Sequence, residues 1–290
     1  MGMIKQVSVV GLGLLGASVS LSILRAMPTV RVVGYSHRKS TREKARQQGI
    51  AGRVEETLQA AVEGADLVIL ATPIRTFEAY FHEMAPSLKE GAIVTDVGST
   101  KAAVHRWAAK LLGKRAHFVG SHPIAGSEKQ GLDYGRDDLL IGARCILTQT
   151  RGTDAKAVAV VQAFWEKLGC TVEQMTPTAH DRTLGMVSHL PHITAASLIN
   201  ANRLGDLYSA GKGFMDTSRV ASGPANIWVD ILLTNPQACV QGIDKLIAQL
   251  GRFRTAIEKG DEKQLEKLLD QARQKREQLI EYKLEKKELF

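Results

Sequence analysis

The chain is poor in cysteine and in aromatic residues, and it has no long apolar run. Its 290 residues include three cysteines, and aromatic residues make up 5% of the chain. The cysteines, Cys145, Cys170 and Cys239, are widely spaced, and no two of them form a C-x-x-C pattern. Their odd number and their spacing argue against a disulfide framework and against a zinc site. They are typical of buried thiols in a reducing compartment. No run is long enough to cross a bilayer, and the N-terminus lacks the pattern of a leader peptide. We therefore expect a cytoplasmic protein without a metal or a membrane partner.

The charge balance is basic, but it does not indicate a nucleic-acid partner. Lysine and arginine number 38 and the acidic residues 30, a net charge of +8. The basic residues form no concentrated patch with interleaved aromatics, so small anionic ligands explain the excess equally well. Near the C-terminus they alternate with glutamates, which is typical of a solvated helix face.

Short β-branched runs alternate with helical stretches in the first half of the chain. This alternation predicts an α/β fold with a parallel sheet covered by helices, a dinucleotide-binding Rossmann domain over residues 1–175. A helix is expected over about 155–168. The predicted strands are Val7 to Val10, Val30 to Tyr35, Leu67 to Ala71, Ile93 to Val97, His117 to Gly120, Cys145 to Thr148 and Thr171 to Met175.

After Pro177 the pattern changes to helical spacing, with no strand-like run. We predict an all-helical second domain over residues 176–290. Its apolar residues recur through Ile193 to Ile199, Ile227 to Leu233, Val240 to Leu250 and Leu265 to Leu279.

A glycine motif follows the first predicted strand and opens a helix at about Ala17. Gly11 allows a tight turn, Gly13 lets the backbone approach a pyrophosphate, and Gly16 lets helix and strand pack closely. The N–H groups at the helix start then bind phosphate. The predicted cofactor-binding residues here are Gly11, Leu12, Gly13, Leu14, Leu15 and Gly16.

The end of the second strand has no acidic residue that would bind the ribose 2′-hydroxyl of NAD. Hydroxyl and basic groups stand there instead, and they suit a 2′-phosphate, so we predict NADP as the cofactor. The alternative is a basic surface loop leading into a helix over 41–48, with NAD held by hydroxyls alone. The candidate residues are Ser36, His37, Arg38, Ser40 and Thr41.

Two further strand ends are expected near the nicotinamide. Thr72 and Pro73 follow one strand, with Thr76 as a possible helix cap, and Ser99 follows the next. Ser99 has two roles open to it that do not exclude each other: it caps the helix that begins near Lys101, and it orients the nicotinamide and an imidazole.

His122 lies in the Gly/Pro-rich segment G-S-H-P-I-A-G, which we predict to be a turn just after a strand. Ligands of open α/β sheets bind beyond the carboxyl ends of the strands, so His122 is the leading catalytic candidate. The alternative is that Pro123 and Gly126 shape a turn and His122 is structural.

The helical domain adds two polar clusters. His189 and His192 are three residues apart, but no third ligand accompanies them, so a metal site is not expected. Arg219 lies beside hydroxyls and Asp216, and its planar fork suits a carboxylate.

Taken together, these motifs resemble the prephenate/arogenate dehydrogenase family of tyrosine biosynthesis over nearly the whole chain. H-P-x-A-G after Ser121 and S-H-L-P after Val187 are its most specific segments. The resemblance implies a Rossmann domain, a helical dimerisation domain in a homodimer, and an active site between the domains. The implied reaction is oxidative decarboxylation of a cyclohexadienol with hydride transfer to NAD(P).

The resemblance also implies roles for individual residues. His122 would accept the ring-hydroxyl proton, and a neutral imidazole suits that task. Ser99 would orient His122 and the cofactor, Arg219 would bind a substrate carboxylate, and His192 would contact the substrate.

Glu128 aligns with an acidic residue near the site, Asp216 with one that gates access, and Trp228 with a tryptophan from the partner subunit. Their alternative roles are surface charge, a helix cap and core packing, respectively. His180 and His189 are expected near the pocket, or His180 caps the helix after Pro177.

The substrate is expected to be prephenate, because some arogenate-preferring relatives have an apolar residue where this chain has His192. Arogenate is the first alternative. The others are a β-hydroxyacid-type dehydrogenase, which should lack the combined histidine and arginine pattern, and a non-catalytic NADP sensor, which would lose the reactive residues.

Overall fold

The structure is a computed structural model, and it describes residues 4–125 and 129–286. Two compact units make up the chain, residues 1–239 and residues 240–290. The domain boundary predicted at residue 175 stays a prediction: β9 ends at Met175 and α7 begins at Pro177, but both elements belong to the first unit.

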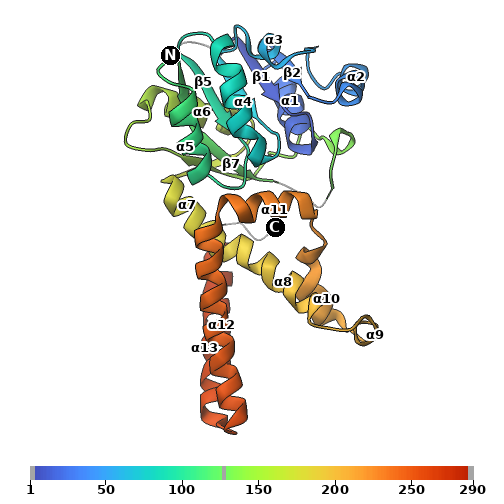
Figure 1. The fold of residues 1–290 in the computed structure, drawn as a ribbon, viewed down its shortest axis with the longest axis vertical. Helices are drawn as coiled ribbons and strands as arrows, with labels where there is room; N and C mark the ends of the chain where they lie inside the picture. The colour runs from blue at the N-terminus through green and yellow to red at the C-terminus, as the bar shows by residue number, and fades with distance from the viewer. Residues whose placement is uncertain (1–3, 126–128, 287–290) are drawn as a thin grey trace. The chain divides into compact units, whose positions relative to one another are not determined.

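The first unit contains a six-stranded parallel sheet in the order β3-β2-β1-β4-β5-β6. Its strands β1, β2 and β5 can be followed in Figure 1. The order reverses between β1 and β4, and in such sheets ligands bind at the carboxyl ends beside this point. The first half is therefore a Rossmann-type domain. The strands are β1 (Gln6–Val10), β2 (Arg31–Tyr35), β3 (Arg53–Val54), β4 (Leu67–Leu70), β5 (Ala92–Asp96) and β6 (Ala116–Phe118).

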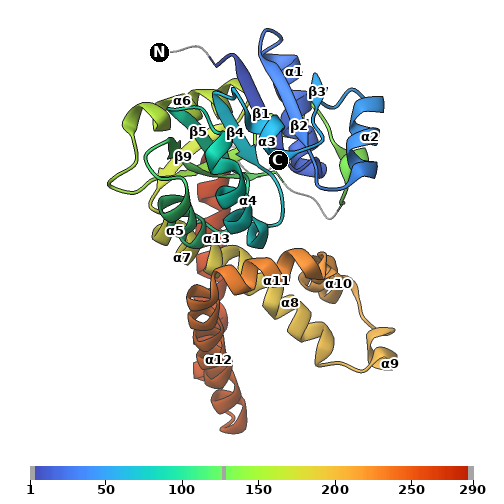
Figure 2. The same ribbon diagram turned by 45° about the horizontal axis from the view of Figure 1, so that its top comes forward.

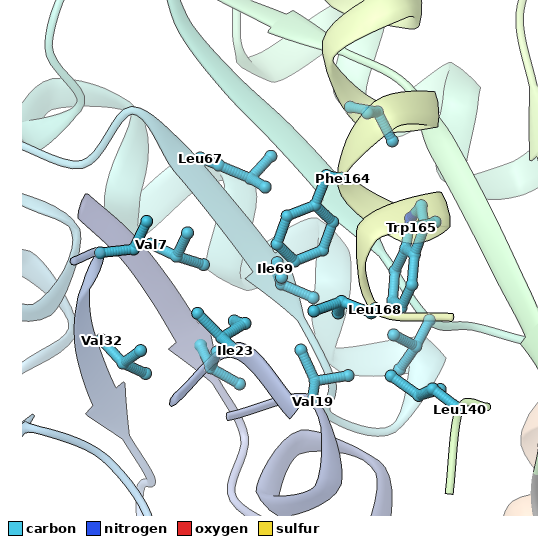
Figure 3. Close-up of a cluster of buried hydrophobic side chains, with 14 of the residues drawn as sticks. Val7, Val19, Ile23, Val32, Leu67, Ile69, Leu140, Phe164, Trp165 and Leu168 are labelled. Carbon is cyan, nitrogen blue, oxygen red and sulfur yellow. The ribbon is translucent and has the colours of Figure 1, made fainter. Parts of the chain in front are cut away.

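Both faces of this sheet are buried, because successive residues of each strand point to opposite sides. In β4, Leu67 and Ile69 join one apolar cluster, and Val68 and Leu70 join the other. The first cluster includes α1 and α6, and Figure 3 shows Phe164 of α6 next to Ile69. The second cluster includes α3, α4 and α5. The helices are α1 (Leu14–Ala26), α2 (Lys39–Gln47), α3 (Leu58–Val62), α4 (Phe77–Met84), α5 (Ala102–Leu111) and α6 (Ala155–Lys167).

A second sheet corrects the prediction of one strand over 117–120 followed by a turn. The chain forms β6, then β7 (Gly120–Ile124), which pairs antiparallel with β8 (Arg144–Thr148), and β8 pairs parallel with β9 (Thr171–Met175). β7 is the edge strand of this sheet, where the missing N–H of Pro123 is tolerated. The prediction that His122 lies in a turn is therefore wrong: it lies in a strand.

The helical segment of the first unit begins with α7 (Pro177–Leu184), a π-helical turn η4 (Gly185–His189) and α8 (Leu190–Asn200). Pro191 in the first turn of α8 has no N–H for the regular helical bond, which is consistent with the wider turn before it. Figure 2 shows α11 next to the nucleotide-binding half, where it contacts η1 (Ile74–Thr76). The remaining elements are α9 (Leu204–Leu207), α10 (Lys212–Ser218), η5 (Arg219–Ser222) and α11 (Ala225–Thr234).

The second unit consists of most of α12 (Pro236–Glu258) and of α13 (Glu262–Glu285). Asp261 caps α13 by accepting a hydrogen bond from the Gln264 N–H at 3.0 Å. The mixed charges predicted to lie on a solvated face do form ion pairs along exposed helix surfaces, among them Arg273 with Glu277 at 2.9 Å. Among the described residues, no helix is both long and apolar enough to cross a membrane.

Candidate active site

A cavity of about 490 Å³ lies at the carboxyl ends of β1, β2, β4 and β5. Its volume is in the range of small-molecule and cofactor sites. Residues 130–132 and one side of α11, with Asn226 and Asp230, complete the wall. Of the predicted cofactor-binding residues, the wall includes Gly11, Leu12, Gly13, Leu14, Leu15, Ser36, His37, Arg38, Thr41, Thr72, Pro73 and Ser99. Gly16, Ser40 and Thr76 do not line it.

The glycine motif has the geometry that a pyrophosphate requires. Gly11 has a φ of +102°, and a Cβ there would lie 2.5 Å from the Ala71 carbonyl oxygen. A Cβ on Gly16 would overlap the Gly11 carbonyl oxygen, so this position keeps helix and strand close. Beside Gly13, in contrast, the space is open, and no acidic residue or side-chain cap occupies the first turn of α1. Open space and exposed helical N–H groups fit the diphosphate of a dinucleotide.

The ribose end of the cavity is basic. Arg38 lines the wall and stands at the N-terminus of α2, which begins at Lys39. Ser40 and Thr41 therefore lie within this helix and not before it. Arg42 is held away from the cavity by Glu56, at 2.7 Å, and by the Ser36 carbonyl, at 2.8 Å, so it shapes the loop.

Asp96 holds the backbone beside both predicted catalytic residues. It is fully buried at the end of β5, where its Oδ1 accepts the Ser121 N–H at 3.1 Å and its Oδ2 accepts the Gly98 N–H at 2.9 Å. Ser121 directly precedes His122, and Gly98 directly precedes Ser99. The ammonium of Lys101, also fully buried, forms an ion pair with Asp96. Sequence reasoning missed both groups, although an acidic residue at a strand end followed by a lysine was the available signal.

The alternative role of Ser99 as a helix cap is wrong. α5 begins at Ala102, and its first N–H groups are capped by a residue 80 positions away in sequence: Asp181 of α7 accepts the Lys101 N–H at 2.7 Å. Ser99 lines the cavity instead. Within the described residues, no hydrogen bond joins Ser99 to His122. Thr76 does not cap α4 with its side chain either; its hydroxyl bonds that of Thr72 at 2.8 Å and the Pro73 carbonyl at 2.7 Å.

His122 contacts a second histidine from the helical segment. Its Nδ1 lies 2.9 Å from Nε2 of His180, and Nδ1 of His180 lies 2.8 Å from Oδ1 of Asp181. His180 is fully buried and is not the cap of α7, because Thr176 accepts the Ala179 N–H there. The pKa of His122 lies well below its ordinary value because the ring is desolvated and because the cation of Lys101 is close by. His122 is therefore neutral at physiological pH and can accept a proton.

Two other histidines of the helical segment have ring nitrogens without partners. His192 stacks on Trp228 with ring centroids 3.5 Å apart and planes at 9°, and His189 contacts the same tryptophan edge-on. Among the described residues, Nε2 of His189 and Nδ1 of His192 are buried and have no hydrogen-bond partner. Buried polar atoms of this kind are rare without a ligand or water. Burial lowers the pKa of His189 to about 4, so its ring is neutral.

The other predicted substrate residues are less buried. Arg219 and Asp216 are exposed, and Asp216 lies inside α10, so its alternative role as a helix cap is wrong. Trp228 is half-buried on α11 and is therefore not a core residue of this chain. Glu128 lies outside the described residues. His122, His192, Arg219 and Trp228 do not line the cavity of the glycine motif.

No group of three or more histidine, cysteine, aspartate or glutamate side chains suited to a metal ion occurs in the described part of the chain. The three cysteines are buried and free.

A parallel sheet with a glycine motif and a cavity at its carboxyl ends is typical of the dinucleotide-binding domain of dehydrogenases. Comparison with known proteins identifies the family. The nucleotide-binding domain of prephenate dehydrogenase matches residues 19–174, and the dimerization domain of prephenate dehydrogenase matches residues 176–271. The chain belongs to the prephenate dehydrogenase family.

Relatives and solved structures agree with this assignment. A cyclohexadienyl dehydrogenase of Zymomonas mobilis is 36% identical over 269 residues, which cover 90% of this chain and 91% of the relative. The structure of prephenate dehydrogenase from Aquifex aeolicus with hydroxyphenyl propionate and NAD+ is 34% identical, covers 96% of this chain and 99% of that one, and has a TM-score of 0.88. Arogenate dehydrogenase from Synechocystis is 32% identical, covers 94% and 99%, and has a TM-score of 0.82.

Proposed function

We propose that this enzyme oxidises and decarboxylates prephenate to 4-hydroxyphenylpyruvate, with NADP as the preferred acceptor and His122 as the base. The observation that carries the proposal is the neutral imidazole of His122, whose Nδ1 lies 2.9 Å from Nε2 of His180. Ser121, the residue before it, shares the carboxylate of Asp96 with Gly98 of the cavity wall. The nicotinamide group supplies a hydride acceptor when bound.

The chemistry fits these residues step by step. His122 accepts the proton of the ring hydroxyl while the hydrogen on the same carbon leaves as hydride. The bond between the ring carbon and its carboxylate then breaks. The electrons of that bond complete the aromatic ring as carbon dioxide departs. The phenol oxygen recovers the proton, so His122 returns to its neutral state.

The substrate carboxylates and side chain are assigned to the helical segment. Arg219 supplies a planar guanidinium for a carboxylate, and the buried nitrogens of His189 and His192 lack partners in the described chain. Ser99 on the cavity wall is assigned to orient the nicotinamide. Asp216 is assigned to gate access to the site and Glu128 to bind the substrate. Trp228 is assigned to a homodimer in which the second subunit completes the site.

The preference for NADP rests on Arg38. It lies on the cavity wall at the N-terminus of α2, whereas Glu56, the nearby carboxylate, is bonded to Arg42 and Arg46 and leaves the ribose end basic. Charge-assisted hydrogen bonds to a 2′-phosphate explain the preference.

The activity is tested by mixing the purified protein with prephenate or arogenate and with NAD or NADP, while reduced nicotinamide and carbon dioxide are followed. We expect the highest kcat/KM with prephenate and NADP, and carbon dioxide equal to reduced cofactor. A higher kcat/KM with arogenate would overturn the substrate assignment. Turnover of a β-hydroxyacid alone, without carbon dioxide, would overturn the reaction.

The cofactor preference has a matched control. Arg38→Ala should reduce kcat/KM for NADP by about 10-fold or more, the scale of a charge-assisted bond, and leave that for NAD nearly unchanged. Lys39→Ala removes the neighbouring charge, which is off the cavity wall and pairs with Glu43 at 3.7 Å, and should change neither value. Equal losses of kcat/KM for NADP in the two variants would show that only the general positive charge of this region matters, and would contradict a specific contact from Arg38.

A further inference from the structure

Three side chains from β7 and α7 form a continuous hydrogen-bonded chain that ends at His122. Nδ1 of His122 lies 2.9 Å from Nε2 of His180, and Nδ1 of His180 lies 2.8 Å from Oδ1 of Asp181. His180 is 0% exposed and Asp181 is 4% exposed, so water does not compete for the bond between them. Nδ1 of His122 and both ring nitrogens of His180 must therefore each act as a donor or an acceptor toward a known neighbour.

The direction of donation is set at Asp181, which meets only donors. Its carboxylate accepts the Lys101 N–H at 2.7 Å and the Ala102 N–H at 2.8 Å, both at the start of α5, in addition to His180. Burial alone would raise the pKa of Asp181, but the bonds from His180 and from the two backbone N–H groups outweigh it and lower the pKa below its ordinary value. Asp181 is therefore ionised and can only accept.

The tautomers of the two histidines follow from this charge. Nδ1 of His180 must carry a proton to donate to Asp181. Because His180 is neutral, with its pKa lowered by burial, its Nε2 has a lone pair and accepts. The Nδ1 of His122 must then be the donor to His180, which leaves the proton off Nε2 of His122.

We propose that His180 and Asp181 are positioning residues, which hold His122 in the tautomer with the proton on Nδ1 and a free lone pair on Nε2. Nε2 is the atom that takes the hydroxyl proton, so this role rests on the proposed function. The opposite tautomer would set the lone pair of His122 Nδ1 against that of the buried His180 Nε2 at 2.9 Å. After proton transfer, His122 is an imidazolium whose Nδ1–H still donates to His180, and the charge of Asp181 stabilises it at the far end of the chain.

The tautomer can be observed without any turnover. In protein labelled with ¹⁵N-histidine, the ring-nitrogen shifts of His122 should report a protonated Nδ1 and an unprotonated Nε2 at neutral pH, assigned by their loss in His122→Asn. A His122 spectrum with the proton on Nε2 would overturn the proposal. This result stands whether or not prephenate is the substrate, whereas absence of turnover in all four assays would sink only the proposed function.

Two substitutions at His180 separate positioning from packing. His180→Gln carries its amide oxygen near the former Nε2, so it can still accept from His122. His180→Asn carries its amide near the former Nδ1, so it keeps a bond to Asp181 but leaves His122 without an acceptor. We expect His180→Asn to lower kcat about 100-fold and to mix the tautomers of His122, and His180→Gln to lower kcat less than about 10-fold with the tautomer retained. Equal losses with an unchanged tautomer in both variants would contradict the positioning role.

A helix-cap control tests Asp181 itself. Asp181 caps α5, and Asp154 caps α6 by accepting the Ala157 N–H at 2.8 Å. Asp181→Asn should disturb the His122 tautomer and lower kcat with little change in KM, whereas Asp154→Asn should cost stability alone. If both variants lower kcat only in proportion to lost folded protein, and His122 keeps its tautomer in both, Asp181 is a structural cap and the proposal fails.

Discussion

Two groups of buried polar side chains differ in whether their hydrogen-bonding atoms find partners within the chain. One is the cluster around His122, and the other is His189 and His192, later in the helical segment. Asp96, Lys101 and Asp181 are buried, and each side chain has a hydrogen-bond partner in the described chain. Nε2 of His189 and Nδ1 of His192, in contrast, are buried without partners in the described chain. The difference indicates that the proton-accepting group is organised before any ligand arrives, whereas substrate recognition is completed by the ligand.

The strongest way to break this comparison is to remove the base. His122→Asn should lower kcat by about two or more orders of magnitude, because the ring-hydroxyl proton then has no neutral imidazole to accept it. The measurement is reduced-nicotinamide formation at saturating substrate, with circular dichroism as the control for folding. Near-normal turnover would remove His122 from the role of base.

The buried pair of Asp96 and Lys101 should also contribute to the stability of the fold. Lys101→Met leaves the carboxylate of Asp96 buried without its cation, and we expect the free energy of unfolding to fall by about 3–5 kcal/mol. Lys39→Met is the control, because that lysine is exposed and its pair with Glu43, at 3.7 Å, contributes about 0–1 kcal/mol. Denaturant unfolding of both variants measures the difference. Equal values would show that the Asp96 pair is not required for stability.

Substitution of the arginine proposed to bind the substrate should weaken substrate binding more than it lowers the stability of the fold. Arg219→Ala should raise KM for the substrate about 10- to 100-fold, the effect of losing a charged hydrogen-bond partner worth about 1.5–3 kcal/mol, with little change in thermal unfolding. Arg203→Ala, at an exposed arginine before α9, should leave KM unchanged. An unchanged KM in Arg219→Ala would contradict its assignment as the carboxylate anchor.

The smallest expected effect is a shift of the pH profile. His122 is active as a base only when neutral, and its pKa is below the ordinary 6.5, so kcat/KM should stay constant as the pH falls to 6.5 and decline only at more acidic pH. An acidic limb with its midpoint at or above 6.5 would contradict the lowered pKa that desolvation and the nearby cation of Lys101 give His122. The charged and titratable groups that face His122 or its partner are His180, Asp181, Lys101, His189, Arg144 and Asp96.

Much of the nucleotide-binding half was predictable because its signals are local. The glycine motif directly follows β1, and the apolar runs of β4 and β5 lie close to their observed bounds. The strand over 117–120 was mispredicted because β6 and β7 are nearly continuous in sequence, and only the partner strand β8 shows that they belong to different sheets. The amino-acid pattern of a short apolar run does not indicate which distant strand it pairs with.

The sequence by itself determined the fold class, the glycine turn at Gly11 and the presence of His122 in a specific motif. The tertiary structure decided what surrounds that histidine. Asp96 lies 26 residues before it and Asp181 lies 59 residues after it, so neither spacing nor periodicity connects them to it. The histidine partner of His122 and the cap of α5 both depend on how α7 packs against β7 and α5, because a hydrogen-bond partner is a matter of distance in space.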